Sequence, residues 1–349
     1  MKKYQDYLNC QTMQLNTTDN DNSITPAKAR WKLLSSIISS SDTNSLVIPT
    51  KFSKRNHQGF NLFSKIKLDH SPLDKVNDKK VENVTLEKKT LTNSEIRLDN
   101  HTPKERHEWY SYYLDDNDCI NIRIKIPNYY DMKNNLYSKY SGFLYTGNIC
   151  VWPAEEVLAY YSLNNSHIFK NKNVCEIGGG MCALASLFIA ARCQPLSVTL
   201  TDGNPDCVQN IQYILNANPK LSSTDLCAKQ MIWDCDTHYD ITYDVVICAD
   251  CTFDKQIHSH LLHVIRSILK KPPKSNPEEC LFLLCAPQRG DSLQEFISLL
   301  KSQGDFHVKL LERYDDFVWK AHQQNIAENS EHYVPDTHYP LIMQAYWRV

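Results

Sequence analysis

Glycine is scarce in this chain, which has only nine glycines among its 349 residues. Three of them, Gly178–Gly180, stand in a row within the segment NVCEIGGGMCALASLFIA, between an apolar run and a stretch of helical character. A chain that uses glycine so sparingly needs a specific reason for placing three together. Glycine is favoured where the backbone adopts positive φ or passes very close to another group.

Other features are missing as well. Neither sign of charge dominates, because 38 Lys and Arg stand against 40 Asp and Glu, so net charge points to neither nucleic acid nor a membrane as partner. No apolar run approaches the roughly 18 residues of a membrane span, and the N-terminal segment MKKYQDYLNCQTMQLNTTDN lacks the apolar core of a signal peptide. The 13 cysteines are scattered, several of them in apolar runs. We expect a soluble protein of a reducing compartment, the cytoplasm, with the nucleus as a second location.

Composition separates an N-terminal region from the rest of the chain. Residues 1–25 are polar, and we expect them to be disordered. Residues 26–146 form an extension of mixed α and β character. Within it, residues 26–39 predict a short amphipathic helix with a basic side, and residues 108–126 predict two strands around a polar turn. Residues 69–108 are rich in Lys, Asp, Glu, Asn and Thr, which predicts a solvated insertion.

Residues 147–349 alternate between strand-like and helix-like segments, after a first helix that begins near Pro153. The expected strands are NVCEI, LSVTLTD, LCAKQMIW, YDVVICAD and ECLFLLCAP, and the helices that follow the first, second, fourth and fifth of them are CALASLFIAAR, PDCVQNIQYILNA, KQIHSHLLHVIRSILKK and DSLQEFISLLKSQ. This alternation predicts an α/β fold with a parallel sheet, helices on both faces and right-handed crossovers. The tail segments FHVKLLERY and YPLIMQAYWRV show no long helix between them, so we expect an antiparallel pair at one edge.

The three glycines end the first strand of this alternating block. Ligands of such sheets bind at the carboxyl ends of the strands. Gly178, Gly180 and Ala183 fit the dinucleotide pattern G-x-G-x-x-A, and Asp202 ends the next strand about twenty residues later. An acid at that position suits a ribose hydroxyl of NAD or of S-adenosylmethionine equally well, so both cofactors stay open on these residues.

Glu176 favours S-adenosylmethionine. It stands two residues before the first glycine, and we expect it at the mouth of the site, where a carboxylate would repel a pyrophosphate. The same carboxylate suits S-adenosylmethionine, which carries an ammonium group and a cationic sulfur. E-x-G-x-G followed by a strand that ends in Asp is the pattern of seven-stranded methyltransferases. A glycine turn with no ligand is the plainer alternative.

Later strand ends add candidates. Trp233 follows the third expected strand, where an adenine ring needs a flat partner, although core packing is an alternative for it. Ala249, Asp250 and Phe253 follow the fourth strand, beside the expected position of the methyl group. A helix N-cap is the alternative for Asp250, but Thr252 or Asp254 fits that role better.

Seven ordered blocks carry a family resemblance: TGNICVWPAEEVLAYY, VCEIGGGMCALASL, TLTDGNPDCVQNIQ, WD, ICADCTFD, CAPQRGDSLQEF and HYPLIM. Together they resemble the calmodulin-lysine N-methyltransferases, a family of class I, seven-stranded protein-lysine methyltransferases with a Rossmann-like sheet. The resemblance covers residues 147–349 almost continuously, reappears at RWKLL and GFNLF, and fails over about 69–108.

The resemblance implies S-adenosylmethionine as methyl donor and a lysine of calmodulin as acceptor, methylated up to three times. The positions that match the family's cofactor site are Trp152, Gly178, Gly179, Gly180, Asp202, Trp233 and Ala249. Asp250 opens a D-x-x-aromatic motif whose last residue is usually tyrosine in related enzymes. This chain has Phe253 there, so no hydroxyl is available at that position to place the amine.

The chemistry limits what these residues need to do. The nucleophile is a neutral amine, and deprotonating a free lysine at pH 7 costs roughly 4–5 kcal/mol. A neighbouring sulfonium lowers the lysine pKa, and alignment of the reacting atoms supplies much of the remaining rate. We therefore expect no strong general base, with Asp250 orienting the amine through a hydrogen bond. Phe253 would wall the channel, where an aromatic face also suits a methylammonium group.

Partner and metal predictions complete the sequence interpretation. Calmodulin is acidic, so a basic docking surface is expected, for which the candidates are Lys51, Lys54, Arg55, Lys65 and Lys67. A solvated basic face is the alternative, and the helix at 26–39 either docks calmodulin or packs on the core. We expect a monomer without a metal site, and no metal or redox use of the C-x-x-C pair Cys248 and Cys251. An NAD-dependent oxidoreductase and an inactive protein-binding relative remain alternatives.

Overall fold

The computed structural model describes residues 60–73, 106–126, 151–328 and 333–348. Several predictions for the N-terminal region therefore lie outside the described residues: the disordered segment 1–25, the helix at 26–39 and residues 74–105 of the insertion. Within the described part of the chain, no helix is long and apolar enough to cross a membrane.

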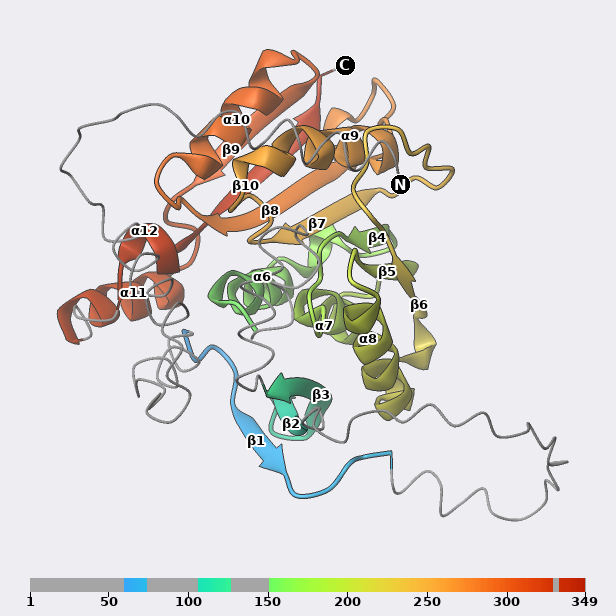
Figure 1. Ribbon diagram of the computed structural model, residues 1–349, viewed down its shortest axis with the longest axis vertical. Helices are drawn as coiled ribbons and strands as arrows, with labels where there is room; N and C mark the ends of the chain where they lie inside the picture. The colour runs from blue at the N-terminus through green and yellow to red at the C-terminus, as the bar shows by residue number, and fades with distance from the viewer. Residues whose placement is uncertain (1–59, 74–105, 127–150, 329–332, 349) are drawn as a thin grey trace, which may run out of the picture. The chain divides into compact units, whose positions relative to one another are not determined.

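The larger sheet has seven strands in the order β6-β5-β4-β7-β8-β10-β9 (Figure 1). Five of them run parallel: β4 (Asn173–Glu176), β5 (Ser197–Asp202), β6 (Asp225–Gln230), β7 (Val245–Ala249) and β8 (Leu281–Pro287). β10 (Pro340–Trp347) lies between β8 and β9 (Phe306–Leu311) and is antiparallel to both. This arrangement confirms the predicted seven-stranded α/β sheet and the antiparallel pair at its edge.

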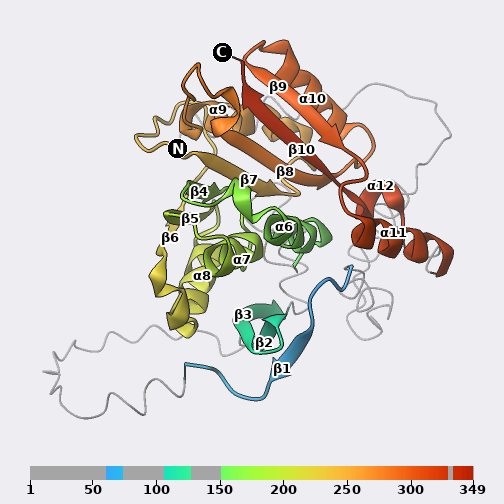
Figure 2. The ribbon, with the colours of Figure 1, turned by 180° about the vertical axis from the view of Figure 1, so that it is seen from behind.

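Helices cover both faces of this sheet (Figures 1 and 2). One face carries α6 (Pro153–Asn164), α7 (Leu184–Arg192) and α8 (Pro205–Ala217), and the other carries α9 (His258–Ile268) and α10 (Ser292–Ser302). The sheet is apolar on both faces because it is buried on both, and all seven residues of β8 are buried.

The expectation that no long helix separates the two tail strands is wrong. The 13-residue helix α11 (Asp316–Glu328) and the short α12 (Pro335–His338) both lie between β9 and β10. The sequence DFVWKAHQQNIAE of α11 buries only Val318 and His322, so it lacks the apolar stripe that marks the other helices.

A separate three-stranded antiparallel sheet contains β1 (Lys65–Leu68), β2 (Arg106–Asp115) and β3 (Asp118–Ile126). β2 and β3 form the predicted hairpin with its polar turn. The outer edge of β3 is covered by two asparagines of the α8 region. Asn218 accepts from the Asn121 amide and donates to its carbonyl, both at 2.8 Å, and Asn210 donates to the carbonyl of Arg123 at 2.9 Å. These side chains satisfy an edge that would otherwise be free to pair with another strand.

Candidate active site

The carboxyl ends of four parallel strands bring the predicted site residues together. β4 ends at Glu176, β5 at Asp202, β7 at Ala249 and β8 at Pro287. Because β5, β4, β7 and β8 are neighbours in one parallel sheet, these ends lie along the same edge. Trp152, directly before α6, contacts the side chain of Arg289, which follows β8.

The backbone conformation and packing of Gly178–Gly180 explain why three glycines stand together. Gly178 and Gly180 have φ of 66° and 62°, in the left-handed region that favours glycine. A Cβ added at Gly178 would stand 2.9 Å from the sulfur of Cys251 and 3.1 Å from the ring of Trp233. At Gly179 it would stand 2.8 Å from the Cβ of Ala183. Conformation and close packing together therefore require glycine in this turn, Gly178–Gly180, which we call the glycine cradle.

Asp202 holds the glycine run against the next strand. Its carboxylate accepts from the amide of Gly180 at 2.9 Å and from the amide of Asn204 at 2.8 Å. Burial raises its pKa although these hydrogen bonds oppose the shift. The carboxylate thus lies at the turn where the ribose is expected, and its role with the ribose stays a prediction.

Glu176 lies behind the glycine run, not at an open mouth, which corrects its expected position. The residue is fully buried, and its Oε2 accepts from the Ser186 amide at 3.1 Å. Its Oε1 is buried without a hydrogen-bond partner in the described part of the chain. Burial raises the pKa of Glu176 to about 7, and the negative charge of Asp202 adds to the shift.

Glu155, which sequence reasoning missed, is a second buried acid beside Glu176. It lies on α6, and its Oε1 accepts from the amide of Leu184 at 2.7 Å and from the thiol of Cys182 at 3.2 Å. α7 begins after Ala183, which has φ of 49° and no side chain able to cap the helix. Glu155 supplies that cap from another helix. Burial raises its pKa to about 8, with a further contribution from the charge of Glu176.

Two buried carboxyl groups, Glu155 and Glu176, and the half-buried carboxyl group of Asp202 therefore lie around the glycine run and the start of α7. Among the residues that the structure describes, no ion pair joins any of them to Lys or Arg. Buried acids without a cation are unfavourable unless they are protonated or a cation is supplied. The site thus fits a positively charged ligand, such as a sulfonium nucleoside with an ammonium group.

Asp250 has a partner that the sequence interpretation did not identify. Arg289, two residues past β8, donates from Nε to Oδ1 of Asp250 at 2.9 Å and from its second terminal nitrogen to Oδ2. The Arg289 guanidinium carbon also lies 5.7 Å from the ring centre of Trp152. Asp250 is not a helix cap: Asp254 accepts from the Gln256 amide at 2.8 Å at the start of the next helical turn, as its position in the sequence indicates.

The other predicted residues lie at the same edge. Trp233 is half-buried against Gly178 and stands three residues past β6, since that strand ends earlier than expected, at Gln230. Ala249 is half-buried at the end of β7, and Phe253 is 38% exposed. Their predicted roles beside the adenine, the methyl group and the lysine channel stay predictions.

The sequence predicts no metal or redox use of the C-x-x-C pair Cys248 and Cys251, but the structure joins the two sulfurs. They form a disulfide, with Cα atoms 6.3 Å apart. Asp250, between them, has φ of 53° and turns the chain back so that residues three apart meet. The pair flanks Asp250 on both sides, so its state bears directly on the geometry of that residue.

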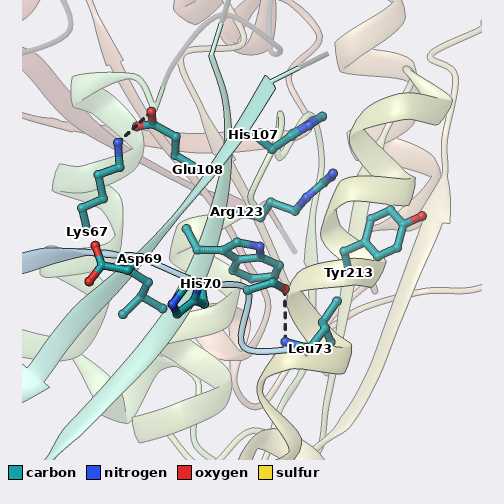
Figure 3. A pocket seen from close by; sticks show the side chains of 11 residues that line it. Lys67, Asp69, His70, Leu73, His107, Glu108, Arg123 and Tyr213 are labelled. Carbon is teal, nitrogen blue, oxygen red and sulfur yellow. Dashed lines mark hydrogen bonds and ion pairs between the residues drawn. The ribbon is translucent and has the colours of Figure 1, made fainter. Parts of the chain in front are cut away.

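An open pocket of about 670 Å³ lies away from these strand ends, between the small sheet and α8 (Figure 3). Lys67 reaches across to Glu108 in an ion pair of 2.8 Å at its rim. The Arg123 guanidinium lies 4.7 Å from the ring centre of Tyr213 and donates to Asn210 at 2.6 Å. Asn210 also donates to the carbonyl of Met181, next to the glycine run, at 2.6 Å. Asn210 therefore links the pocket to the segment that follows the glycine run.

Comparisons with known proteins found similar sequences and solved structures. A family model described as lysine methyltransferase matches residues 146–303. The calmodulin-lysine N-methyltransferase of Arabidopsis thaliana is 33% identical over 322 residues, which cover 90% of this chain and 95% of the plant protein. The human protein-lysine N-methyltransferase EEF2KMT is 27% identical over 135 residues, 35% of this chain and 41% of that protein. Among solved structures, an O-methyltransferase of Bacillus cereus in complex with SAH is 9% identical, with a TM-score of 0.37, over 64% of this chain and 93% of its own.

Proposed function

Because this chain belongs to the family of protein-lysine N-methyltransferases, we propose that it methylates a lysine side chain of calmodulin. The observation that carries the choice of acceptor is the similarity to the plant calmodulin-lysine enzyme, which extends over 90% of the chain. The similarity to EEF2KMT, in contrast, spans 35% of the chain. The NAD-dependent and inactive alternatives are not favoured, since the matching relatives are named as methyltransferases.

S-adenosylmethionine is the methyl donor of this class, and it supplies a methyl group on a cationic sulfur. The glycine run would pass beneath it, Asp202 would bind the ribose, and Trp233 would face the adenine. A cation bound beside Glu176 and Glu155 would favour the ionised forms of these acids over the protonated forms that burial favours. Glu176 has one buried oxygen without a hydrogen-bond partner in the described chain.

The acceptor side of the site lies at the end of β7. Asp250 would accept an N–H of the lysine amine and orient its lone pair, while Ala249 and Phe253 flank the methyl group and the channel. The amine attacks as a neutral group: the new N–C bond forms as the S–C bond breaks, and the S–C electron pair stays on sulfur. Alignment and electrostatics, rather than a strong base, account for the rate.

Docking of an acidic substrate protein requires basic residues outside the cofactor site. Of the predicted candidates, Lys65 and Lys67 lie on β1, where Lys65 stands 5.7 Å from the ring centre of Tyr112. Lys51, Lys54 and Arg55 lie outside the described residues. Lys67 also lies at the rim of the pocket in Figure 3, so β1 supplies the described part of the docking surface that we propose.

Incubation with isotopically labelled S-adenosylmethionine and unmethylated calmodulin tests the proposal. We expect label on one mapped lysine of calmodulin and none when that lysine is replaced by arginine. An Asp250→Ala variant should lose most turnover, about 100-fold or more, while binding S-adenosylmethionine normally by calorimetry. Absence of label in calmodulin, with cofactor bound, contradicts the choice of acceptor. Normal turnover of Asp250→Ala contradicts the role of that carboxylate.

A further inference from the structure

Arg289 connects three elements at the acceptor side of the site. Its guanidinium makes a two-pronged contact with Asp250, after β7, and lies over the ring of Trp152, before α6. Arg289 itself follows β8. The Asp250 side chain is only 7% exposed, and that of Arg289 is 23% exposed, so the pair is shielded from water to a degree that surface ion pairs are not.

The backbone holds both residues in place at a cost. Asp250 and Arg289 have φ of 53° and 47°, in a region that non-glycine residues rarely adopt. The Asp250 amide donates to the carbonyl of Cys285 at 2.8 Å, and the Arg289 amide donates to the carbonyl of Asp336 at 2.8 Å. These backbone hydrogen bonds hold Asp250 and Arg289 in a fixed orientation toward each other.

A carboxylate next to a reacting amine creates a chemical problem. An unpaired aspartate stabilises the ammonium form of a nearby lysine and raises its pKa. The ammonium has no lone pair and cannot attack a methyl group. A site that uses Asp250 to orient the amine therefore needs a means of cancelling its charge. Arg289 provides this, because its guanidinium stays protonated at any working pH.

We propose that Arg289 is a positioning residue that neutralises Asp250 and so makes the site select the neutral amine of the substrate lysine. This inference rests on the lysine methyl transfer proposed above. The two-pronged contact uses one lone pair on each oxygen of Asp250 and leaves another to accept an amine N–H. The lysine loses its proton to water before attack. Its lone pair then forms the N–C bond, and the S–C electron pair stays on sulfur.

Rate–pH profiles at saturating substrate test this role, because the rising limb reports the pKa of the bound lysine. Arg289→Gln exposes the charge of Asp250, so the limb should move up by about one pH unit. Asp250→Asn leaves the guanidinium uncompensated, so the limb should move down. Arg289→Lys keeps the positive charge but cannot make the two-pronged contact with Asp250. The rate should therefore fall, while the rising limb of the profile stays within about 0.3 pH unit of its wild-type position. Opposite shifts of the two neutral variants distinguish this role from a structural one.

Two results overturn the inference. One is a rate reduction in Arg289→Gln that is equal at every pH, and the other is a shift of both neutral variants in the same direction. A thermal double-mutant cycle of Asp250→Asn and Arg289→Gln tests the pair without any substrate, and additive losses in Tm also overturn it. If the wild-type protein does not label calmodulin, the proposed acceptor fails, and the thermal cycle still decides on the pair.

Discussion

At the residue scale, Gly178 shows how packing and conformation combine. Its φ of 66° alone makes any other residue costly, by roughly 1–2 kcal/mol. Cys251 and Trp233 add a second restriction, because they fill the space that a Cβ would need. The position therefore excludes alanine for a reason specific to the cofactor site.

Gly178→Ala should lower affinity for S-adenosylmethionine by about tenfold or more, since the cradle must shift to admit the methyl group. Gly304→Ala is a matched control: its φ of 76° is similar, but nothing lies within 4 Å of the added Cβ. The positive φ should cost each variant about 1 kcal/mol of stability, and the contacts with Cys251 and Trp233 add to the loss in Gly178→Ala. Calorimetry should find weaker binding of S-adenosylmethionine only for Gly178→Ala. Equal affinity in the two variants would contradict a role of the glycine cradle in cofactor binding.

At the element scale, α7 depends on a cap supplied by α6. Glu155→Ala removes the acceptor of the Leu184 amide and should destabilise the protein by about 1–3 kcal/mol, the cost of an unsatisfied buried donor. Glu155→Gln retains an oxygen acceptor for this amide, so it should cost far less. Urea unfolding at neutral pH compares the two variants. Equal losses would mean that the cap contributes nothing.

Most elements were predictable because an alternation of apolar strands and amphipathic helices encodes a parallel sheet locally. α11 was missed because its polar sequence carries no such periodicity. The predicted site residues follow the strands and the glycine run, both of which are visible in the sequence. Glu155 and Arg289 were not found because their partners, Leu184 and Asp250, stand 29 and 39 residues away, so only the folded structure brings them together.

At the scale of the whole molecule, the buried acids make stability depend on pH. The pKa of Glu176 rises to about 7 and that of Glu155 to about 8, from an ordinary value of 4.5. The folded state therefore binds these protons more tightly than the unfolded state. The stabilising contribution is full below about pH 4.5 and is lost as pH rises toward 7 to 8, at about 1.4 kcal/mol per pKa unit.

Tm of the cofactor-free protein should accordingly fall between about pH 5 and pH 8.5 by more in the wild type than in Glu176→Gln, which does not titrate. Scanning calorimetry on both proteins across this range measures the contribution of Glu176, including its effect on the pKa of Glu155. Parallel curves of Tm against pH would show that the pKa of Glu176 is not raised in the folded protein.

The central claim is that the glycine cradle and the buried acids at the strand tips form a site for a sulfonium nucleoside. Calorimetric titration of the purified protein with S-adenosylmethionine, with NADH as the alternative ligand and Glu176→Gln as the variant, tests it directly. We predict saturable binding of S-adenosylmethionine, weaker binding by the variant and no heat with NADH. No heat with S-adenosylmethionine, or preferential binding of NADH, would contradict the account.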